Sequence, residues 1–125
     1  MSNKEVVPGD SEYDYDSLND TFYIYYSSRK YSSSKILEDL VIDMNADNKV
    51  VGIEVLNASK KFGISKYELR SPVELECEID VSDSKVNINL KFTFLKRNHH
   101  IARTMSVTGT NDMNLSPASN SFALA

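Results

Sequence analysis

The chain has 125 residues, of which 41% are hydrophobic and 26% are charged, and its formal net charge is −4. These values describe one globular domain large enough to bury a hydrophobic core, and they exclude a largely disordered chain. The single cysteine, Cys77, excludes an internal disulfide and a cysteine-rich metal site, while the acidic net charge argues against nucleic acid as a partner.

The beginning of the chain is polar. Residues 1–11 contain Pro8 and Gly9 and no apolar signal segment, so we expect a flexible leader. No apolar run in the sequence approaches the length that spans a membrane. We therefore expect a cytoplasmic protein without a membrane partner.

The first predicted unit is a tyrosine-rich hairpin. Residues 21–26 (Thr-Phe-Tyr-Ile-Tyr-Tyr) are β-branched or aromatic and predict a strand. Residues 13–16 alternate tyrosine with aspartate and predict its partner strand, because residues 17–20 between them have turn composition.

Oxygen-bearing side chains around this turn superficially resemble a calcium-binding loop. Leu18 occupies a ligand position, however, and the glycine and the distal glutamate of such a loop are absent. We expect acidic, solvent-facing hairpin positions and no metal site. The residues concerned are Asp14, Asp16, Asn19 and Asp20.

A second hairpin is predicted after a polar connection at 27–34. Its strands are residues 40–44 and 49–56, joined by a turn at 45–48. Gly52 inside the second strand indicates a bulge or a close approach of the backbone. Glu54 has two interpretations: a buried carboxylate that marks a functional pocket, or a residue on the solvent-facing side.

One short helix is expected near residues 57–63. Asn57 is a favourable N-cap, and Gly63 is a favourable residue just after the last turn. We expect no other helix.

The clearest pattern lies in residues 73–81 and 86–94, where apolar and polar side chains alternate. Alternation places each apolar set on one face of a sheet. If Val81 lies opposite Val86, then Cys77 lies opposite Leu90 and both apolar faces coincide; a shift by one residue would bury glutamates. Cys77 is thereby expected in the core, as a small hydrophobic residue.

The remaining elements are a turn at 96–100 and a third alternating strand at 101–107. Residues 111–125 form either a floppy tail or an arm that docks on the domain or on a neighbouring subunit.

These elements predict a mainly β fold, α+β at most, built as an antiparallel sheet of hairpins. We expect a single domain over residues 12–110, comprising a first half at 12–63 and C-terminal hairpins at 72–109.

The first half resembles a prokaryotic family of small proteins of unknown function. The resemblance rests on Tyr13-Asp14, on Phe22-Tyr23-Ile24, and on Gly52-Ile53-Glu54-Val55-Leu56-Asn57-Ala58-Ser59. Members typically have aspartate where this chain has Asn57, and the hairpins from 73 to 109 look like the extension of longer, often archaeal, members. The resemblance implies a β-rich fold and brings no established activity, cofactor or catalytic residue.

Six of the seven tyrosines lie between Tyr13 and Tyr31. A two-stranded hairpin cannot bury all of them, and an exposed tyrosine is well suited to a protein interface. We take Tyr23, Tyr25 and Tyr31 as candidate partner contacts, with mixed core and surface packing as the alternative.

A second group of candidates is basic. Residues 84–103 contain no acidic side chain, and Arg97, His99, His100 and Arg103 are candidate contacts for a small anionic ligand. Adjacent histidines point to opposite faces of a strand and do not share a metal easily. We find no nucleophile–base–acid set and predict neither a catalytic residue nor a metal or other cofactor.

The function expected from the sequence is a non-enzymatic protein-interaction or self-assembling module, present as a homo-oligomer. One alternative is an oligomeric protein that binds or sequesters an anionic metabolite or nucleotide. A second alternative is a weak, hydrolase-like enzyme.

Overall fold

A computed structural model gives the fold of the chain and describes residues 4–6, 11–27, 30–112 and 114–124. Most of the described chain is strand, and the two helices are short. In chain order the elements are β1 (Lys4–Val6), β2 (Ser11–Asp16), β3 (Thr21–Tyr26), β4 (Ser33–Leu37), β5 (Leu40–Met44), β6 (Val50–Val55), α1 (Ala58–Phe62), α2 (Lys66–Leu69), β7 (Glu74–Val81), β8 (Lys85–Lys96), β9 (His99–Thr110) and β10 (Ala118–Leu124).

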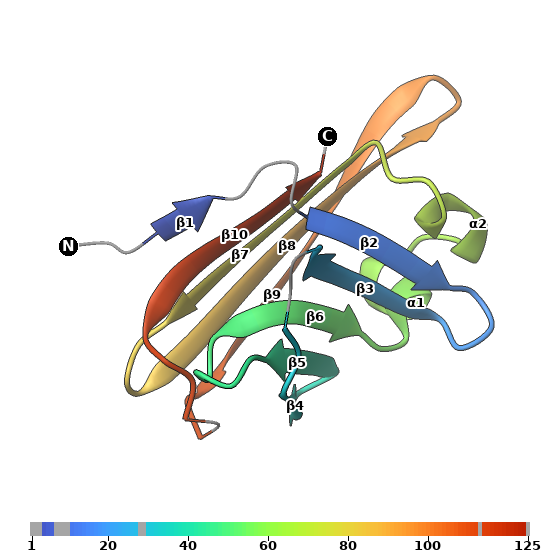
Figure 1. The fold of residues 1–125 in the computed structure, drawn as a ribbon. Helices are drawn as coiled ribbons and strands as arrows, with labels where there is room; N and C mark the ends of the chain where they lie inside the picture. The colour runs from blue at the N-terminus through green and yellow to red at the C-terminus, as the bar shows by residue number, and fades with distance from the viewer. Residues whose placement is uncertain (1–3, 7–10, 28–29, 113, 125) are drawn as a thin grey trace.

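The strands form two five-stranded sheets that lie face to face (Figure 1). Sheet A has the order β1-β10-β7-β8-β9, and sheet B has the order β2-β3-β6-β5-β4. Neighbouring strands are antiparallel except for the parallel pair β1–β10. The strands of sheet B cross those of sheet A in Figure 1. The prediction of a mainly β fold is confirmed.

The hydrophobic core fills the space between the sheets and is closed at one end by α1. Phe92 of β8 is at its centre: its ring centroid lies 5.2 Å from that of Phe22 in sheet B and 5.4 Å from that of Phe62 in α1. All three rings are buried, and such aromatic pairs stabilise a fold beyond the area they bury. Neither described helix is long and apolar enough to cross a membrane.

The predicted register of the central hairpin is confirmed. Val81 lies opposite Val86 and Cys77 lies opposite Leu90, and the pairing of β7 with β8 has no irregularity. Burial alternates strictly along β7, with every apolar side chain buried and every acidic one exposed. The alternation of the sequence therefore fixes this register.

The hairpin of β8 and β9 is longer than expected and projects beyond sheet B (Figure 1). Its pairing runs unbroken from Lys85 opposite Thr110 to Lys96 opposite His99. The turn is limited to Arg97 and Asn98, whose φ angles of 50° and 64° are left-handed. Such angles suit a tight hairpin turn.

The start of α1 differs from the prediction that Asn57 caps it. Asn57 has a left-handed backbone (φ 53°, ψ 44°) and its side chain makes no capping hydrogen bond. The cap comes from Asp20, in the β2–β3 turn, whose carboxylate accepts a hydrogen bond from the Ser59 amide (3.0 Å to Oδ1). The Asn57 prediction is wrong because the capping group comes from another part of the fold.

Helix α2 and strand β4 were not expected, and neither was β1, which is described below. Helix α2 begins with a capping box, in which the hydroxyl of Ser65 accepts from the amide of Glu68 (3.1 Å) while the Glu68 carboxylate accepts from the amide of Ser65 (3.1 Å). The expectation of a single helix is therefore wrong. Strand β4 starts inside the polar segment that was expected to be a connection and pairs with β5.

Both ends of the chain contribute strands to sheet A. Lys4–Val6, within the expected leader, form β1, while residues 1–3 and 7–10 of that segment lie outside the described residues. In the expected tail, β10 lies between β1 and β7 and pairs with β7 from Val81 to Leu75. The described part of the expected tail thus includes a strand that pairs within its own chain.

Candidate functional site

Tyr23 and Tyr25 lie together on the outer face of sheet B, the face that points away from sheet A. Their ring centroids are 4.5 Å apart. Gly52, opposite Tyr25 on β6, makes room for them: a Cβ atom at Gly52 would lie 2.9 Å from Cε1 of Tyr23 and 3.1 Å from Cβ of Tyr25. The prediction of a close approach at Gly52 is therefore confirmed. The sheet is also irregular here, since the β5–β6 register shifts beside Asp43, which pairs with Gly52.

Glu54 lies next to this tyrosine pair and is partly buried. Burial, the nearby charge of Asp43 and a hydrogen bond with Asp43 raise the pKa of Glu54 above its usual value. The hydroxyl of Ser34 donates to Asp43 (2.6 Å) and is itself 2.8 Å from the hydroxyl of Tyr31. Tyr31 is thus connected to this cluster through Ser34, although its side chain is 58% exposed.

The acidic residues of the β2–β3 hairpin are used by hydrogen bonds of the fold. Asp16 accepts from the amides of Leu18 (3.0 Å) and Asn19 (3.1 Å), and Asp14 accepts from the hydroxyl of Tyr25 (2.9 Å). Asp20 caps α1. In the part of the chain that the structure describes, no three His, Cys, Asp or Glu side chains gather as a metal site.

The basic candidates lie at the projecting end of the β8–β9 hairpin, but the structure does not bring all of them together. Arg97 is in the turn, and His99 and His100 are consecutive in β9 and therefore point to opposite faces. His99 pairs with Lys96 and shares a face with Arg103, which pairs with Phe92. Two of the four predicted residues, His99 and Arg103, thus share the inner face of the hairpin.

Arg103 is exposed and weakly held within its own chain. One guanidinium nitrogen donates to the carbonyl of the neighbouring Ala102 (3.2 Å), and the guanidinium carbon lies 6.0 Å from the ring centroid of Phe94. That distance is at the outer limit of a cation–π contact. The pKa of the nearby Glu68 is lowered chiefly by hydrogen bonds from Ser65, and the positive charges of Lys96 and Arg103 lower it further.

A pocket of about 390 Å³ opens beside β9, and sequence reasoning missed it. Met105 and Val107 of β9 supply apolar walls, while Glu38 and Asp39 of the β4–β5 turn and Lys61 of α1 supply charge. Lys61 forms an ion pair with Asp39. No sequence pattern could reveal this pocket, because its walls come from three segments that meet only in the folded chain.

Leu37 and Gly109 hold the acidic turn next to β9. A Cβ atom at Gly109 would overlap the side chain of Leu37, so a larger residue here would require Leu37 to shift. Leu37 directly precedes the turn residues Glu38 and Asp39. The approach of β4 to β9 at Gly109 therefore forms the pocket.

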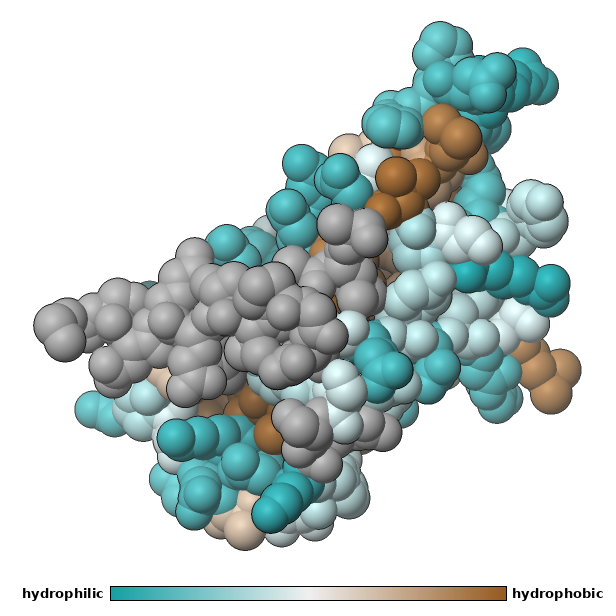
Figure 2. All heavy atoms as spheres, turned by 45° about the horizontal axis from the view of Figure 1, so that its top comes forward, coloured by the Kyte–Doolittle hydropathy of each residue, from teal (hydrophilic) through white to brown (hydrophobic). Residues whose placement is uncertain are grey.

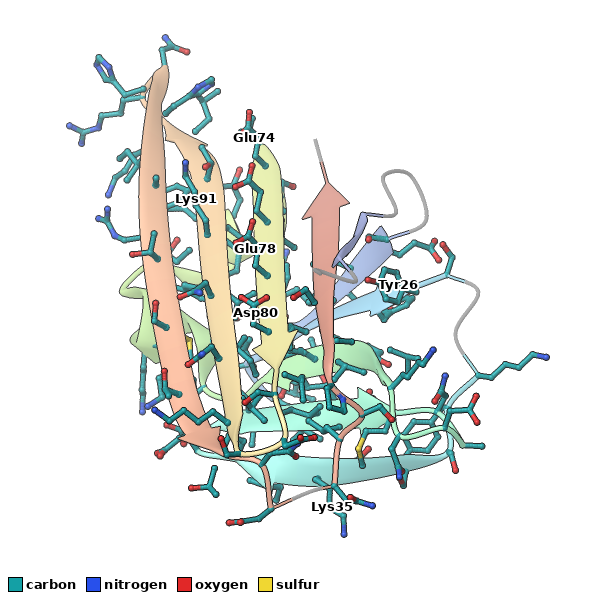
Figure 3. All side chains as sticks on the ribbon, turned by 90° about the vertical axis from the view of Figure 1, so that its left-hand side faces the viewer. Tyr26, Lys35, Glu74, Glu78, Asp80 and Lys91 are labelled. Atoms are coloured by element: carbon teal, nitrogen blue, oxygen red, sulfur yellow. The ribbon has the colours of Figure 1, made fainter. Side chains whose placement is uncertain are left out.

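The outer face of sheet A is polar and strongly patterned (Figure 3). Glu74, Glu78 and Asp80 follow one another along β7, and Lys91 projects from the neighbouring β8. A second hollow of about 370 Å³ lies over this face. Cys77 points the other way: it is buried in the core, and burial raises the pKa of its thiol, so the prediction of a core cysteine is confirmed.

The surface has no single large hydrophobic area on the face shown in Figure 2, where hydrophobic residues form small separate areas among hydrophilic ones. The exposed large hydrophobic side chains are scattered over the described chain, as is usual for a folded domain. They are Leu18, Tyr31, Ile36, Tyr67 and Leu95.

Comparison with known proteins finds relatives but no structural match. Residues 12–59 match a family described as "Protein of unknown function (DUF2283)". A protein of Methanosarcina mazei named "Putative hypoxanthine phosphoribosyltransferase" is 34% identical over 105 residues, which are 84% of this chain and 85% of that protein. An uncharacterized protein of Methanocaldococcus jannaschii is 34% identical over 103 residues, 82% of this chain and 89% of its own length.

No solved structure matches the chain. The family match covers β2 to the start of α1, which includes Tyr23, Gly52 and Glu54 on the outer face of sheet B. Both relatives are archaeal and extend the similarity over most of the C-terminal hairpins as well. The chain belongs to the DUF2283 family of proteins of unknown function.

Proposed function

We propose that the protein is a non-enzymatic interaction module that self-assembles by adding a strand at the outer edge of β9. The observation that carries the proposal is the contrast between this edge and the other sheet edges. An edge strand presents unpaired backbone N–H and C=O groups, which recruit another strand unless the edge is short, charged or covered.

Three of the four edges have such protection. The described part of β1 has three residues. β2 exposes a row of carboxylates on one side of a six-residue strand, and like charges oppose the approach of a second copy. β4 has five residues, and although Ile36 is 72% exposed, Lys35 beside it is also exposed.

Within the strand itself, the fourth edge, β9, carries charge only toward the hairpin turn, where Arg103 is exposed. It has twelve residues, its pairing with β8 contains no bulge, and no described strand pairs with its other side. From Thr104 to Thr110 it has neither a charged residue nor a proline. In Figure 3 β9 is the left-hand strand of sheet A, and no described strand of the sheet lies beyond it.

Strand addition at this edge uses interactions that every extended chain can make. Main-chain hydrogen bonds supply affinity, and pockets for alternate side chains supply specificity. Thr104, Ser106 and Thr108 are exposed on one side of the strand, while Met105 and Val107 face the other. A strand laid against β9 would further cover Met105, which is partly buried, whereas Val107 is already buried in the core.

The test is the mass of the particle as a function of concentration, measured by sedimentation velocity and native mass spectrometry. We expect a monomer–oligomer equilibrium, and we expect Thr104→Lys to shift it to the monomer, because the added charges of the two copies meet at the edge. Leu18→Lys is the control, since Leu18 is 89% exposed in the β2–β3 turn of the other sheet. A particle that stays monomeric at every concentration contradicts the proposal.

A further inference from the structure

The pocket beside β9 and the side chain of Arg103 have complementary charges, and Arg103 is not among the residues that line the pocket of its own chain. The pocket has apolar walls from Met105 and Val107 and acidic groups from Glu38 and Asp39. Arg103 is exposed on the same face of the same strand as Met105 and Val107, but it lies farther toward the hairpin turn. A second copy, running antiparallel along β9, would bring its own Arg103 to the pocket.

We propose that β9 pairs with β9 of a second copy across a two-fold axis and that Arg103 of each copy enters the pocket of the other. The inference rests on the proposed function and adds the identity of the partner, the register of the two strands and the residue that each copy contributes. The occupant of the pocket is an arginine of this same chain.

The faces of the sheets restrict the register. When the two-fold axis runs perpendicular to a continuous sheet, paired residues of the two strands have their side chains on the same face. One residue of β9 must therefore lie opposite its own copy, with the axis between the two copies. Centring on Thr104 or on Met105 gives the most extensive overlap of residues 99–110. The two possibilities differ in where Arg103 lies.

Centring on Met105 is favoured by charge. With Thr104 at the axis, Arg103 of the two copies would be diagonal neighbours, which are about 7–8 Å apart and repel. With Met105 at the axis, Arg103 lies opposite Val107 of the second copy, and the two arginines are well separated. Val107 is one of the pocket walls, so the register that relieves the repulsion also directs Arg103 to the pocket.

The charges of the pocket suit a guanidinium group. Glu38 and Asp39 carry two negative charges and Lys61, which pairs with Asp39, carries one positive charge, so one negative charge is left without a match in the pocket. The aliphatic part of an arginine packs against Met105 and Val107 while its planar head reaches the carboxylates. Arg103 gives up the weak contacts to Ala102 and Phe94 described above, together with the minor attraction of the nearby Glu68 carboxylate.

The test uses two charge reversals that each break the contact and together restore it. Arg103→Glu places a carboxylate against Glu38 and Asp39 of the other copy, and Glu38→Lys adds a cation where Arg103 of the other copy should bind. We expect each variant alone to raise the dimer dissociation constant about a hundredfold, since like charges at an interface cost several kcal/mol.

Mixing the two variants should restore association at both pockets of a mixed dimer. At one pocket the new carboxylate at position 103 meets the new ammonium at position 38, and at the other the original Arg103 meets the original Glu38. Native mass spectrometry distinguishes this mixed dimer from the two parents by mass. Arg97→Glu, the same reversal in the hairpin turn, is the control and should leave the dissociation constant within about threefold of the original.

The outcomes separate this inference from the proposed function. Restored association on mixing supports both. If Thr104→Lys gives monomers but Arg103→Glu and Glu38→Lys leave the dimer unchanged, assembly through β9 stands and the Arg103 contact is wrong. If none of the three changes affects an observed dimer, both are wrong. Unchanged far-ultraviolet circular dichroism and thermal midpoints show that each variant is folded.

Discussion

A single carboxylate, that of Asp20 in the β2–β3 turn, joins strand β2 of sheet B to helix α1. It accepts hydrogen bonds from the hydroxyl of Tyr15 (2.6 Å) and from the hydroxyl (2.6 Å) and amide (3.0 Å) of Ser59. Burial alone would raise the pKa of Asp20, but the hydrogen bonds from Ser59 and Tyr15 outweigh it and leave the pKa below its usual value. The carboxylate therefore acts as a charged cap from a distant turn.

Replacing this carboxylate by its neutral isostere should be costly. We expect Asp20→Asn to lower the free energy of unfolding by about 2 kcal/mol, because a buried charged acceptor with several donors is lost. Urea denaturation at neutral pH measures this loss. Asp16→Asn, which changes an exposed acceptor in the same turn, should cost less, and an equal loss for both variants would contradict the role given to Asp20.

The pH dependence of Asp20 has a definite sign. Since its pKa is lower folded than unfolded, its contribution to stability is complete above the usual pKa of aspartate and is lost as the pH falls through the folded value. The stability difference between the original protein and Asp20→Asn should therefore shrink in acid.

The contribution of Glu54 to stability changes with pH in the opposite direction. Its pKa is raised, so the folded state binds its proton more tightly, and stability decreases as the pH rises from the usual glutamate pKa, about 4.3, through the raised value. We expect the original protein to lose stability relative to Glu54→Gln across this interval, as measured by urea denaturation at a series of pH values. Glu74→Gln, at an exposed position in β7, is the control; the same pH profile for both variants would contradict the assignment.

The contact between β4 and β9 depends on the lack of a side chain at Gly109. We expect Gly109→Ala to cost about 1–3 kcal/mol, the usual range for overpacking, because its methyl group would overlap Leu37. In a Leu37→Ala background the same change should cost much less. A double-mutant cycle by urea denaturation measures the difference, and equal costs in both backgrounds would show that the two elements do not meet here.

Strand β10 belongs to the fold of its own chain. Ending the chain before Ala118 would leave the edge of β7 from Leu75 to Val81 without its partner. We expect this truncation to reduce the thermal midpoint sharply and to promote aggregation through the newly exposed edge. Circular dichroism on heating, together with light scattering, tests this expectation; a truncated protein of unchanged stability would contradict it.

The elements that could be predicted from the sequence are those in which the order of apolar and polar side chains within the element determines its structure. Strict alternation specified β7 and β8 down to the register, since any slip would bury glutamates. β4 was missed because an exposed edge strand such as Ser-Ser-Lys-Ile-Leu has no regular alternation. Helix α2 could have been found from Ser65 and Glu68, which have the spacing of a capping box.

The candidate site was less predictable, for a physical reason. Tyr23 and Tyr25 were selected because the tyrosine content of this segment is unusual, and Glu54 because it interrupts an apolar strand; the predicted contact role of the tyrosines stays a prediction, and Tyr25 is buried. The pocket beside β9 depends on a turn, a helix and a strand that are distant in sequence. The sequence showed Arg103 as a basic residue but not the acidic groups that it could meet.

The assembled protein should respond to concentration and to salt. Association stabilises the folded state by mass action, so the thermal midpoint should rise with protein concentration. The proposed contact of Arg103 with Glu38 and Asp39 is partly exposed, and the dissociation constant should increase when ionic strength is raised from about 0.1 M to 1 M. Differential scanning calorimetry and sedimentation at several salt concentrations test this; a midpoint independent of concentration would contradict assembly.

The strand order of sheet A also determines the sequence of events during folding. β7, β8 and β9 are consecutive and need only short turns, whereas β1 and β10 meet only when segments from opposite ends of the described chain close a very long loop. Closure of such a loop costs more entropy and is slower. The three-stranded meander should therefore form the nucleus, with mutations in it slowing refolding, while those that weaken β1 or β10 should mainly accelerate unfolding.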